Sequence, residues 1–271
     1  MTIFKKTLVA LAVTACAMAA NTAVAATAFN PFIVDPTGTR ANFIADKITG
    51  NYTEVATFNS NGTFDVSLFY NAGQFVTNGG NTALNASTTG LGIDYQLYAT
   101  YKASGTVTNA GGITTFTFLP GTGSLQMYLD ANNNTNLVSG ITTPTTGSGS
   151  YSFASSGDDI LIATGSPITG LGTLNPSLST CGSAGGSGIN CGSFGSTTTF
   201  NLTAAGKTFF VGPVPFFDAS FQSGQLNNFT PIGTQTINGS LDVAFTKVPE
   251  PTSIALLGLG LLGIGLSRRR M

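Results

Sequence analysis

The stretch IDYQLYATYK, from Ile93 to Lys102, alternates apolar and polar side chains over ten residues. Successive side chains of a β-strand point to opposite faces, so this alternation predicts a strand with one apolar face. The residues expected on that face are Ile93, Tyr95, Leu97, Ala99 and Tyr101. At about 3.3 Å per residue the stretch spans roughly 30 Å. We therefore expect a long central strand.

Shorter stretches of the same kind lie on both sides of this strand. Strands are expected at residues 52–58, 63–70, 113–119, 124–130, 150–154, 160–163, 196–203, 208–211, 218–222, 234–237 and 241–245. The first two flank Asn61-Gly62, a pair typical of tight hairpin turns. No stretch of ten residues with helical period separates the strands. The pattern predicts an all-β fold, an antiparallel sandwich, jelly roll or barrel.

The N-terminus has the three parts of a secretory signal peptide. Lys5 and Lys6 precede an apolar core at residues 8–20, and Ala23-Val24-Ala25 forms a small-x-small cleavage site. We expect a signal peptide at residues 1–25. In an alternative interpretation, residues 13–16 form a lipoprotein signal and Cys16 is lipidated.

The C-terminal 24 residues predict a membrane-anchored processing signal. An extended segment is expected at Val248, Pro249, Glu250 and Pro251, because the two prolines restrict the backbone and have no N–H to donate. Residues 254–266 carry no charge, and a helix from residue 252 would rise roughly 22 Å, less than the ~30 Å bilayer core. A basic membrane stop follows at Arg268, Arg269 and Arg270. The alternative is a buried C-terminal core helix.

The order of motif, short span and basic tail over residues 248–270 resembles the PEP-CTERM sorting signal of exopolysaccharide-producing Gram-negative bacteria. The resemblance implies transient anchoring in the inner membrane, cleavage by an exosortase-type membrane protease, and a final place at the cell surface or in the extracellular matrix. The body also resembles the flocculation-associated PEP-CTERM proteins. That resemblance rests on six stretches, residues 45–52, 64–68, 71–75, 158–161, 189–196 and 220–229. It implies association with extracellular polysaccharide and supplies no catalytic residue.

Between these two signals, residues 26–247 are expected to form one extracellular β domain with two long loops. Residues 141–150 could instead be a linker, and residues 171–195 are rich in glycine. Cys181 and Cys191 lie in the second loop, and a pair of cysteines in an exported chain predicts a disulfide.

Charge and composition narrow the classes of function. Only 8% of the chain is charged, and residues 26–248 contain ten acidic and five basic residues, a net charge of −5. Nucleic acid binding depends on clustered lysine and arginine, so no nucleic acid partner is expected. The chain has no histidine, which excludes Ser-His-Asp and Cys-His catalysis. We expect no enzyme activity and no cofactor.

Two weaker patterns give candidate sites. Asp158-Asp159 would serve a glycosidase only with a partner such as Asp94 or Asp218, and a polar strand start is the favoured interpretation. Asp130, Asn132 and Asn134 resemble half of a calcium loop. The glycine at the sixth position and the glutamate at the twelfth are missing, so a hairpin turn is favoured.

Exposed aromatic rings could stack on sugar rings. The candidates for glycan contact are Tyr98, Phe69, Phe216 and Phe217. If both faces of the sheet are covered, these rings belong to the core instead. The sequence thus predicts a non-enzymatic exported protein of the polysaccharide matrix that supports flocculation. The alternative is a carbohydrate-binding module or adhesin with an exposed aromatic face.

Overall fold

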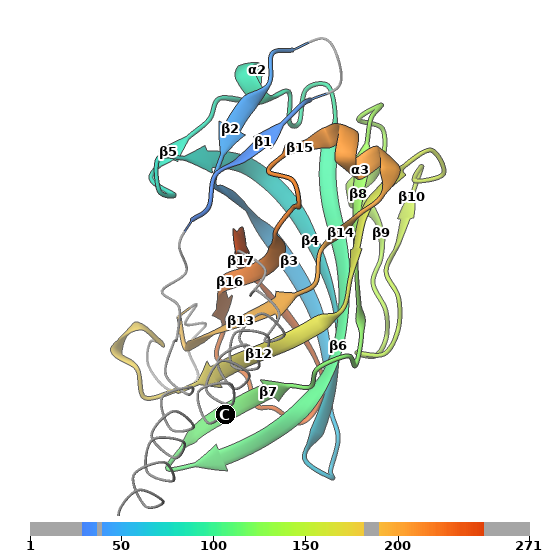
Figure 1. Ribbon diagram of the computed structural model, residues 1–271. Helices are drawn as coiled ribbons and strands as arrows, with labels where there is room; N and C mark the ends of the chain where they lie inside the picture. Colours follow the sequence, from blue (N-terminus) through green and yellow to red (C-terminus); the bar gives the residue numbers. More distant parts are fainter. Residues whose placement is uncertain (1–28, 37–39, 182–189, 247–271) are drawn as a thin grey trace, which may run out of the picture.

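The computed structural model describes residues 29–36, 40–181 and 190–246, and these are folded almost entirely into β-strands (Figure 1). The predicted signal peptide and the predicted sorting segment from Val248 to Met271 lie outside the described residues. The expectation of an all-β, antiparallel fold is confirmed.

Eight antiparallel strands pair side by side until the last meets the first, which closes the sheet into a ring. In order around the ring they are β3 (Lys47–Phe58), β4 (Thr63–Thr77), β6 (Gln96–Ala110), β7 (Ile113–Phe118), β12 (Pro167–Leu174), β13 (Gly192–Thr198), β16 (Asp218–Leu226) and β17 (Gly233–Thr246). The ring is completed where β17 pairs with β3 along twelve residues. A single sheet therefore encloses the core from all sides.

Strand β6 is the predicted central strand, and it belongs to two parts of the sheet. One edge pairs with β4 from Tyr98 to Thr106. The other edge pairs with β8 (Ser124–Asp130) along its first half and with β7 along its second half. The sheet splits at Gly123, where a Cβ atom would lie 1.9 Å from the carbonyl oxygen of Lys102. Only glycine allows β8 to leave β7 at this point.

Beyond the split, the sheet continues outward from the ring. Strand β8 pairs with β11 (Ile160–Gly165), which pairs with the short β14 (Asn201–Leu202). On the far side of the ring, β5 (Thr82–Ala83) pairs with the end of β4.

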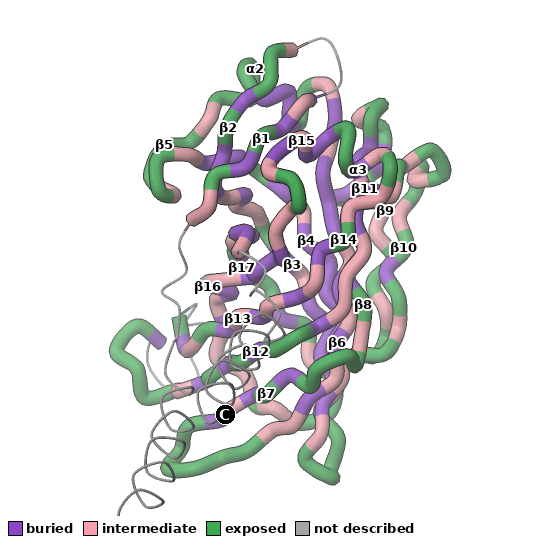
Figure 2. The backbone as a smooth tube through the Cα atoms, in the orientation of Figure 1, coloured by how far each residue is buried: buried purple, intermediate pink, exposed green. Residues whose placement is uncertain are grey.

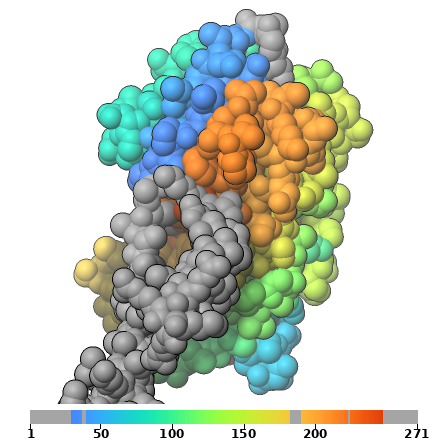
Figure 3. Space-filling model, in the orientation of Figure 1, coloured from blue at the N-terminus to red at the C-terminus, as the bar shows by residue number. Residues whose placement is uncertain are grey.

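A small sheet and two short helices cover one end of the ring. The sheet has the order β15 (Phe210–Gly212), β1 (Phe32–Val34), β2 (Phe43–Ala45). In the space-filling view, the blue β1–β2 segment and the orange segment of α3 (Ala204–Phe209) and β15 pack together over this end (Figure 3). Helix α3 begins at a cap, where the Thr203 side chain accepts a hydrogen bond from the Gly206 backbone N–H. The helix α2 (Ala86–Thr89) forms a single turn nearby.

The interior of the ring is apolar and rich in phenylalanine. On β6, Leu97, Ala99 and Tyr101 point inward and are buried, whereas Thr100 and Lys102 are partly exposed on the outside. The buried inner positions appear in purple along the ring strands (Figure 2). The predicted apolar face is confirmed for these three residues, and Ile93 departs from it because it lies in a turn and is exposed.

A two-stranded hairpin, β9 (Asn136–Thr142) and β10 (Ser152–Ala154), lies outside the ring against β3, β4 and β6. It holds a second apolar cluster between itself and the ring. The buried members are Val55, Phe69, Tyr98, Leu137 and Tyr151. The segment between the two strands also contacts the ring, because the Gly147 N–H donates to the Thr57 hydroxyl at 2.8 Å.

Several local predictions are wrong. The strands predicted at residues 234–237 and 241–245 are one strand, β17, and the strand predicted at residues 196–203 is divided between β13 and β14. The sequence predicts a strand at residues 208–211, but Thr208 and Phe209 end helix α3 and the strand begins at Phe210. The predicted loop at residues 171–195 contains the end of β12 and the start of β13, which pair from Leu174–Gly192 onward. By contrast, the hairpin at Asn61-Gly62 is confirmed, with Gly62 at φ 79°.

Candidate functional site

A groove of about 340 Å³ lies between the outer face of the sheet and the β9–β10 hairpin. Its floor consists of side chains that face each other across β4, β6 and β8. One cross-strand row joins Ser67, Lys102 and Ser124, and the next includes Thr100 and Gln126. Residues 150–153 and Ser156 form the wall. The volume falls within the range typical of small-ligand sites.

Two pairs of aromatic rings close one end of the groove. Tyr98 on β6 stacks on Tyr128 on β8, with ring centroids 5.2 Å apart and an interplanar angle of 17°. On the hairpin, Tyr151 and Phe153 are nearly parallel at 6.4 Å. Tyr128 and Phe153 are partly exposed, so these two rings present apolar surface to the groove.

Hydrogen bonds hold the aromatic end in position. The Tyr98 hydroxyl donates to Asp159 Oδ2 at 2.5 Å, and the Thr135 hydroxyl lies 2.7 Å from Asp159 Oδ1. Burial, followed by this hydrogen bond, raises the pKa of Tyr98 well above its ordinary value. Tyr98 therefore stays a neutral donor, and Asp159 joins the turn before β11 to the central strand.

Lys102 is the cationic side chain in the groove. Its Nζ donates to the Ser148 carbonyl at 3.1 Å and to the Ser150 hydroxyl at 2.8 Å. Arg40 and Lys47, by contrast, are paired with Asp94 and Asp242. An ammonium group has three donors, and neutral oxygens take two of those at Lys102. One donor of this groove-lining side chain is left without a partner among the described residues.

Several polar groups of the groove have no hydrogen-bond partner among the described residues. They are the side chains of Thr100, Ser124, Gln126 and Ser152. Hydroxyl and amide groups both donate and accept, so this set suits a ligand that carries many hydroxyls. The arrangement of partly exposed rings beside free hydroxyls and amides can bind a sugar through its apolar face and its polar edge.

The four candidate rings for glycan contact belong to apolar clusters or pack against one. Tyr98 is 2% exposed and Phe69 is 4% exposed, because the hairpin covers the outer face of the sheet at both positions. The interpretation of these two rings as core residues is the one that the structure supports, and they lie beneath the groove. Phe216 and Phe217 are partly buried and pack against the main core. The rings that do face the groove, Tyr128 and Phe153, lie on strands that the sequence predicted.

The calcium-loop residues form a hydrogen-bonded turn. Asp130 is buried, and its carboxylate accepts bonds from the Thr135 N–H at 2.8 Å, the Asn132 N–H at 3.2 Å and the Gln96 amide at 3.2 Å. The amide of Asn132 donates to Asp158 at 2.6 Å, as does that of Asn134 at 3.3 Å. Within the described ranges no group of three acidic, cysteine or histidine side chains could hold a metal ion. The hairpin-turn interpretation fits this geometry.

Asp158 and Asp159 have separate roles in the same turn. Asp158 is exposed and bound by Asn132 and Asn134, and these bonds, with a backbone N–H, lower the pKa of its carboxyl. Asp159 is bound by Tyr98 and Thr135. Each carboxylate thus stabilises the turn that precedes β11.

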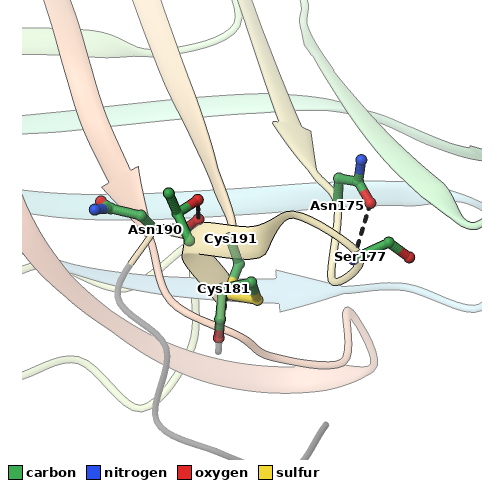
Figure 4. Close-up of a disulfide and its surroundings, with 6 residues drawn as sticks. Asn175, Ser177, Cys181, Asn190 and Cys191 are labelled. Atoms are coloured by element: carbon green, nitrogen blue, oxygen red, sulfur yellow. Dashed lines mark hydrogen bonds between the residues drawn. A yellow bond between two sulfur atoms is a disulfide. The ribbon is translucent and has the colours of Figure 1, made fainter. Parts of the chain in front are cut away.

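The predicted disulfide between Cys181 and Cys191 is confirmed (Figure 4). Both cysteines are fully buried, and Cys181 lies in the short 3₁₀ helix η1 (Ser179–Cys181). The Cys191 N–H donates to the Leu226 carbonyl at 2.9 Å and its carbonyl accepts from the Asn175 N–H at 2.7 Å. The bridge therefore anchors η1 beside the ends of β12, β13 and β16.

Comparison with known proteins bears on the C-terminal segment. Residues 247–270 match the family described as the PEP-CTERM protein-sorting motif. The chain carries a PEP-CTERM sorting motif. No curated protein and no solved structure matches the chain.

The sorting motif implies an exported protein that is held transiently in a membrane and processed by an exosortase. Its residues Val248 to Pro251 and Arg268 to Arg270 lie outside the described part of the structure. Among the described residues, no helix is long and apolar enough to span a bilayer. Strand β17 ends at Thr246, one residue before the match begins.

Proposed function

We propose that this protein is a non-enzymatic component of the extracellular matrix of a Gram-negative bacterium, and that it supports flocculation by binding exopolysaccharide in the groove between the hairpin and the sheet. The observation that carries the proposal is the combination of partly exposed rings at Tyr128 and Phe153 with unpartnered polar groups on one floor. The sorting motif supports it independently, because it implies an exported protein.

The groove suits one or two sugar residues of a longer chain. Sugars have apolar faces formed by C–H groups and polar rims formed by hydroxyls, and the groove offers rings for the first and hydrogen-bonding groups for the second. The free donor of Lys102 suits a hydroxyl or a carboxylate of the polymer. Direct contacts of this number give a weak site, so useful affinity would come from many copies of the protein on one polymer.

The test is binding of the purified exported protein to the exopolysaccharide of its own host. We expect Tyr128→Ala and Gln126→Ala each to weaken binding by about tenfold, the equivalent of ~1.4 kcal/mol. The matched control is Gln74→Ala, on the exposed outer part of β4 and outside the groove. Equal binding by all four proteins would refute the groove as the polysaccharide site.

Two further measurements address the rest of the proposal. Deletion of the gene should reduce flocculation, and a copy with Gln126→Ala should restore it incompletely. Polymer incubated with pure protein should keep its length, because the protein is proposed to bind and not to cleave. Shortened polymer would contradict the non-enzymatic role.

A further inference from the structure

An apolar hollow of about 440 Å³ lies beside the connection between β15 and β16, residues 213–217. In Figure 1 this connection is the orange segment that leads from β15 to β16. Its first four residues line the hollow together with residues of β14, β15 and helix α3. Eight of the ten lining residues are apolar, the other two are Asn201 and Lys207, and none is acidic. Lys207 is exposed, so the hollow is an apolar site with a cation at its rim.

The apolar surface continues outward from the hollow. Val214 is 89% exposed, which makes it the most exposed large apolar side chain of the described residues, and Pro215 beside it is also exposed. The next residue, Phe216, packs against the main core and fixes the base of this connection. An exposed valine and proline next to an apolar hollow form a contiguous apolar patch, and such patches mark surfaces that contact a partner or a membrane.

The hollow borders the point at which the chain leaves the domain. Strand β17 ends at Thr246, which pairs with Asp218, the first residue of β16. The ring of Phe216 lies 5.1 Å from the ring of Phe245, the last residue but one of β17. The apolar patch and the start of the sorting segment therefore share one edge of the ring.

The length of the sorting segment limits how far this edge can move from a membrane. The match to the sorting motif begins at residue 247, and five residues separate Thr246 from the predicted start of the membrane helix at residue 252. At about 3.6 Å per residue, five residues span at most roughly 18 Å. While the protein is anchored, the end of β17 and the hollow beside it stay close to the bilayer surface.

The charge at this edge matches an anionic membrane. Lys207 makes no ion pair with an acidic side chain of the described residues. Lysine side chains near a membrane are attracted to anionic headgroups, and apolar side chains between them enter the boundary between headgroups and acyl chains. The surface offers both elements, since Val214 and Pro215 lie beside a hollow that Lys207 borders.

We infer that the docking face, formed by Lys207 and residues 213–216, lies on an anionic phospholipid bilayer while the protein is tethered. Val214 and Pro215 enter the interface, and the Lys207 ammonium group contacts the lipid phosphates. The tether and the docking face together fix the orientation of the domain on the membrane. A contact this small is weak without the tether, so cleavage of the sorting segment releases the domain. The inference depends on the sorting motif and not on the groove proposed to bind polysaccharide.

The test uses the absence of tryptophan from the chain. Val214→Trp places a single fluorescent reporter on the docking face. Val138→Trp is the matched control, because Val138 is 87% exposed and lies on β9 of the outer hairpin. The exported chain, with its sorting segment kept intact in a host without an exosortase, is placed in nanodiscs of phosphatidylglycerol and phosphatidylcholine, with or without bromine on the acyl chains. Bromine quenches only a tryptophan that enters the bilayer. Emission from Val214→Trp should shift to the blue and fall about twofold with brominated lipid, and emission from Val138→Trp should stay unchanged.

A second variant tests the role of charge. Lys207→Glu, added to the Val214→Trp chain, should remove most of the quenching, because an acidic side chain is repelled by anionic headgroups. Nanodiscs of phosphatidylcholine alone should have the same effect on the Val214→Trp chain. Equal quenching of the two reporters, no quenching of Val214→Trp, or quenching that Lys207→Glu leaves unchanged would overturn the proposal. A blue shift without quenching would also overturn it, because protein and not lipid would then cover the docking face.

Discussion

The Tyr98 hydroxyl and the Asp159 carboxylate are joined by a hydrogen bond of 2.5 Å that links the central strand to the turn before β11. Tyr98→Phe keeps the buried ring and removes only this bond, so it should lower the free energy of unfolding by about 1–2 kcal/mol. Thermal unfolding of the two proteins measures the difference. As a control, Tyr128→Phe changes a hydroxyl for which the structure shows no hydrogen bond among the described residues, and it should be close to neutral. Equal losses in both variants would contradict this role for Asp159.

The carboxyl group of Glu54, buried on the inner face of β3, should make the stability of the protein depend on pH. Its pKa is about 8 in the folded protein and 4.5 is its ordinary value, so the unfolded chain releases this proton at lower pH. The contribution of Glu54 to stability is therefore fully present below pH 4.5 and is lost as the pH rises toward 8. Chemical unfolding across this range should show a steeper decline for the native protein than for Glu54→Gln. Parallel pH profiles would show that Glu54 titrates normally.

The disulfide stabilises the end of the ring by restricting the unfolded chain. Cys181 and Cys191 are ten positions apart, and closing a loop of this length is worth roughly 2–3 kcal/mol in the chain-entropy model. The Cys181→Ser, Cys191→Ser double variant should lose this amount under oxidising conditions. Under reducing conditions the native protein and the double variant should differ little, which provides the control. A difference that persists after reduction would assign the effect to packing.

Gly105 is required by the packing of the core. A Cβ atom at this position would lie 2.3 Å from the Phe64 ring and 2.4 Å from the Thr117 carbonyl oxygen. Gly105→Ala should therefore destabilise the protein by about 1–3 kcal/mol, because the backbone of β7 must shift. Gly157→Ala is the matched control, since a Cβ atom there would have no neighbour within 4 Å and the φ of Gly157 is not positive. Equal melting temperatures for both variants would contradict this account.

The sequence predicts well the strands in which apolar and polar residues alternate along the strand itself. Leu97 and Tyr101 face the core as expected, because a strand with one polar face needs no knowledge of its neighbours. Strand β12 is hidden in a predicted loop because Gly170 and Gly172 occupy its buried positions. The rings of Phe118 and Phe116 on the adjacent strand fill the space above them. Because the apolar rings of this pair lie on β7, which the sequence does predict, the glycines of β12 show no apolar alternation of their own.

The candidate groove depends even more on distant contacts. Tyr128 and Phe153 lie in strands that the sequence predicts, but nothing in their own stretches indicates that β9 and β10 fold back over the outer face of the sheet. That contact buries Tyr98 and leaves Tyr128 at the edge. In the sequence Glu54 is one acidic residue among eleven, and its burial inside the ring arises only when the ring closes.

The long pairing of β17 with β3 has a mechanical consequence. The sorting motif begins one residue after β17 ends, so tension on the membrane tether enters the domain along the axis of that strand. The bonds of an antiparallel ladder run perpendicular to the strands, and twelve paired residues would share such a load simultaneously. A pull from the membrane thus loads this ladder in shear, at right angles to its hydrogen bonds.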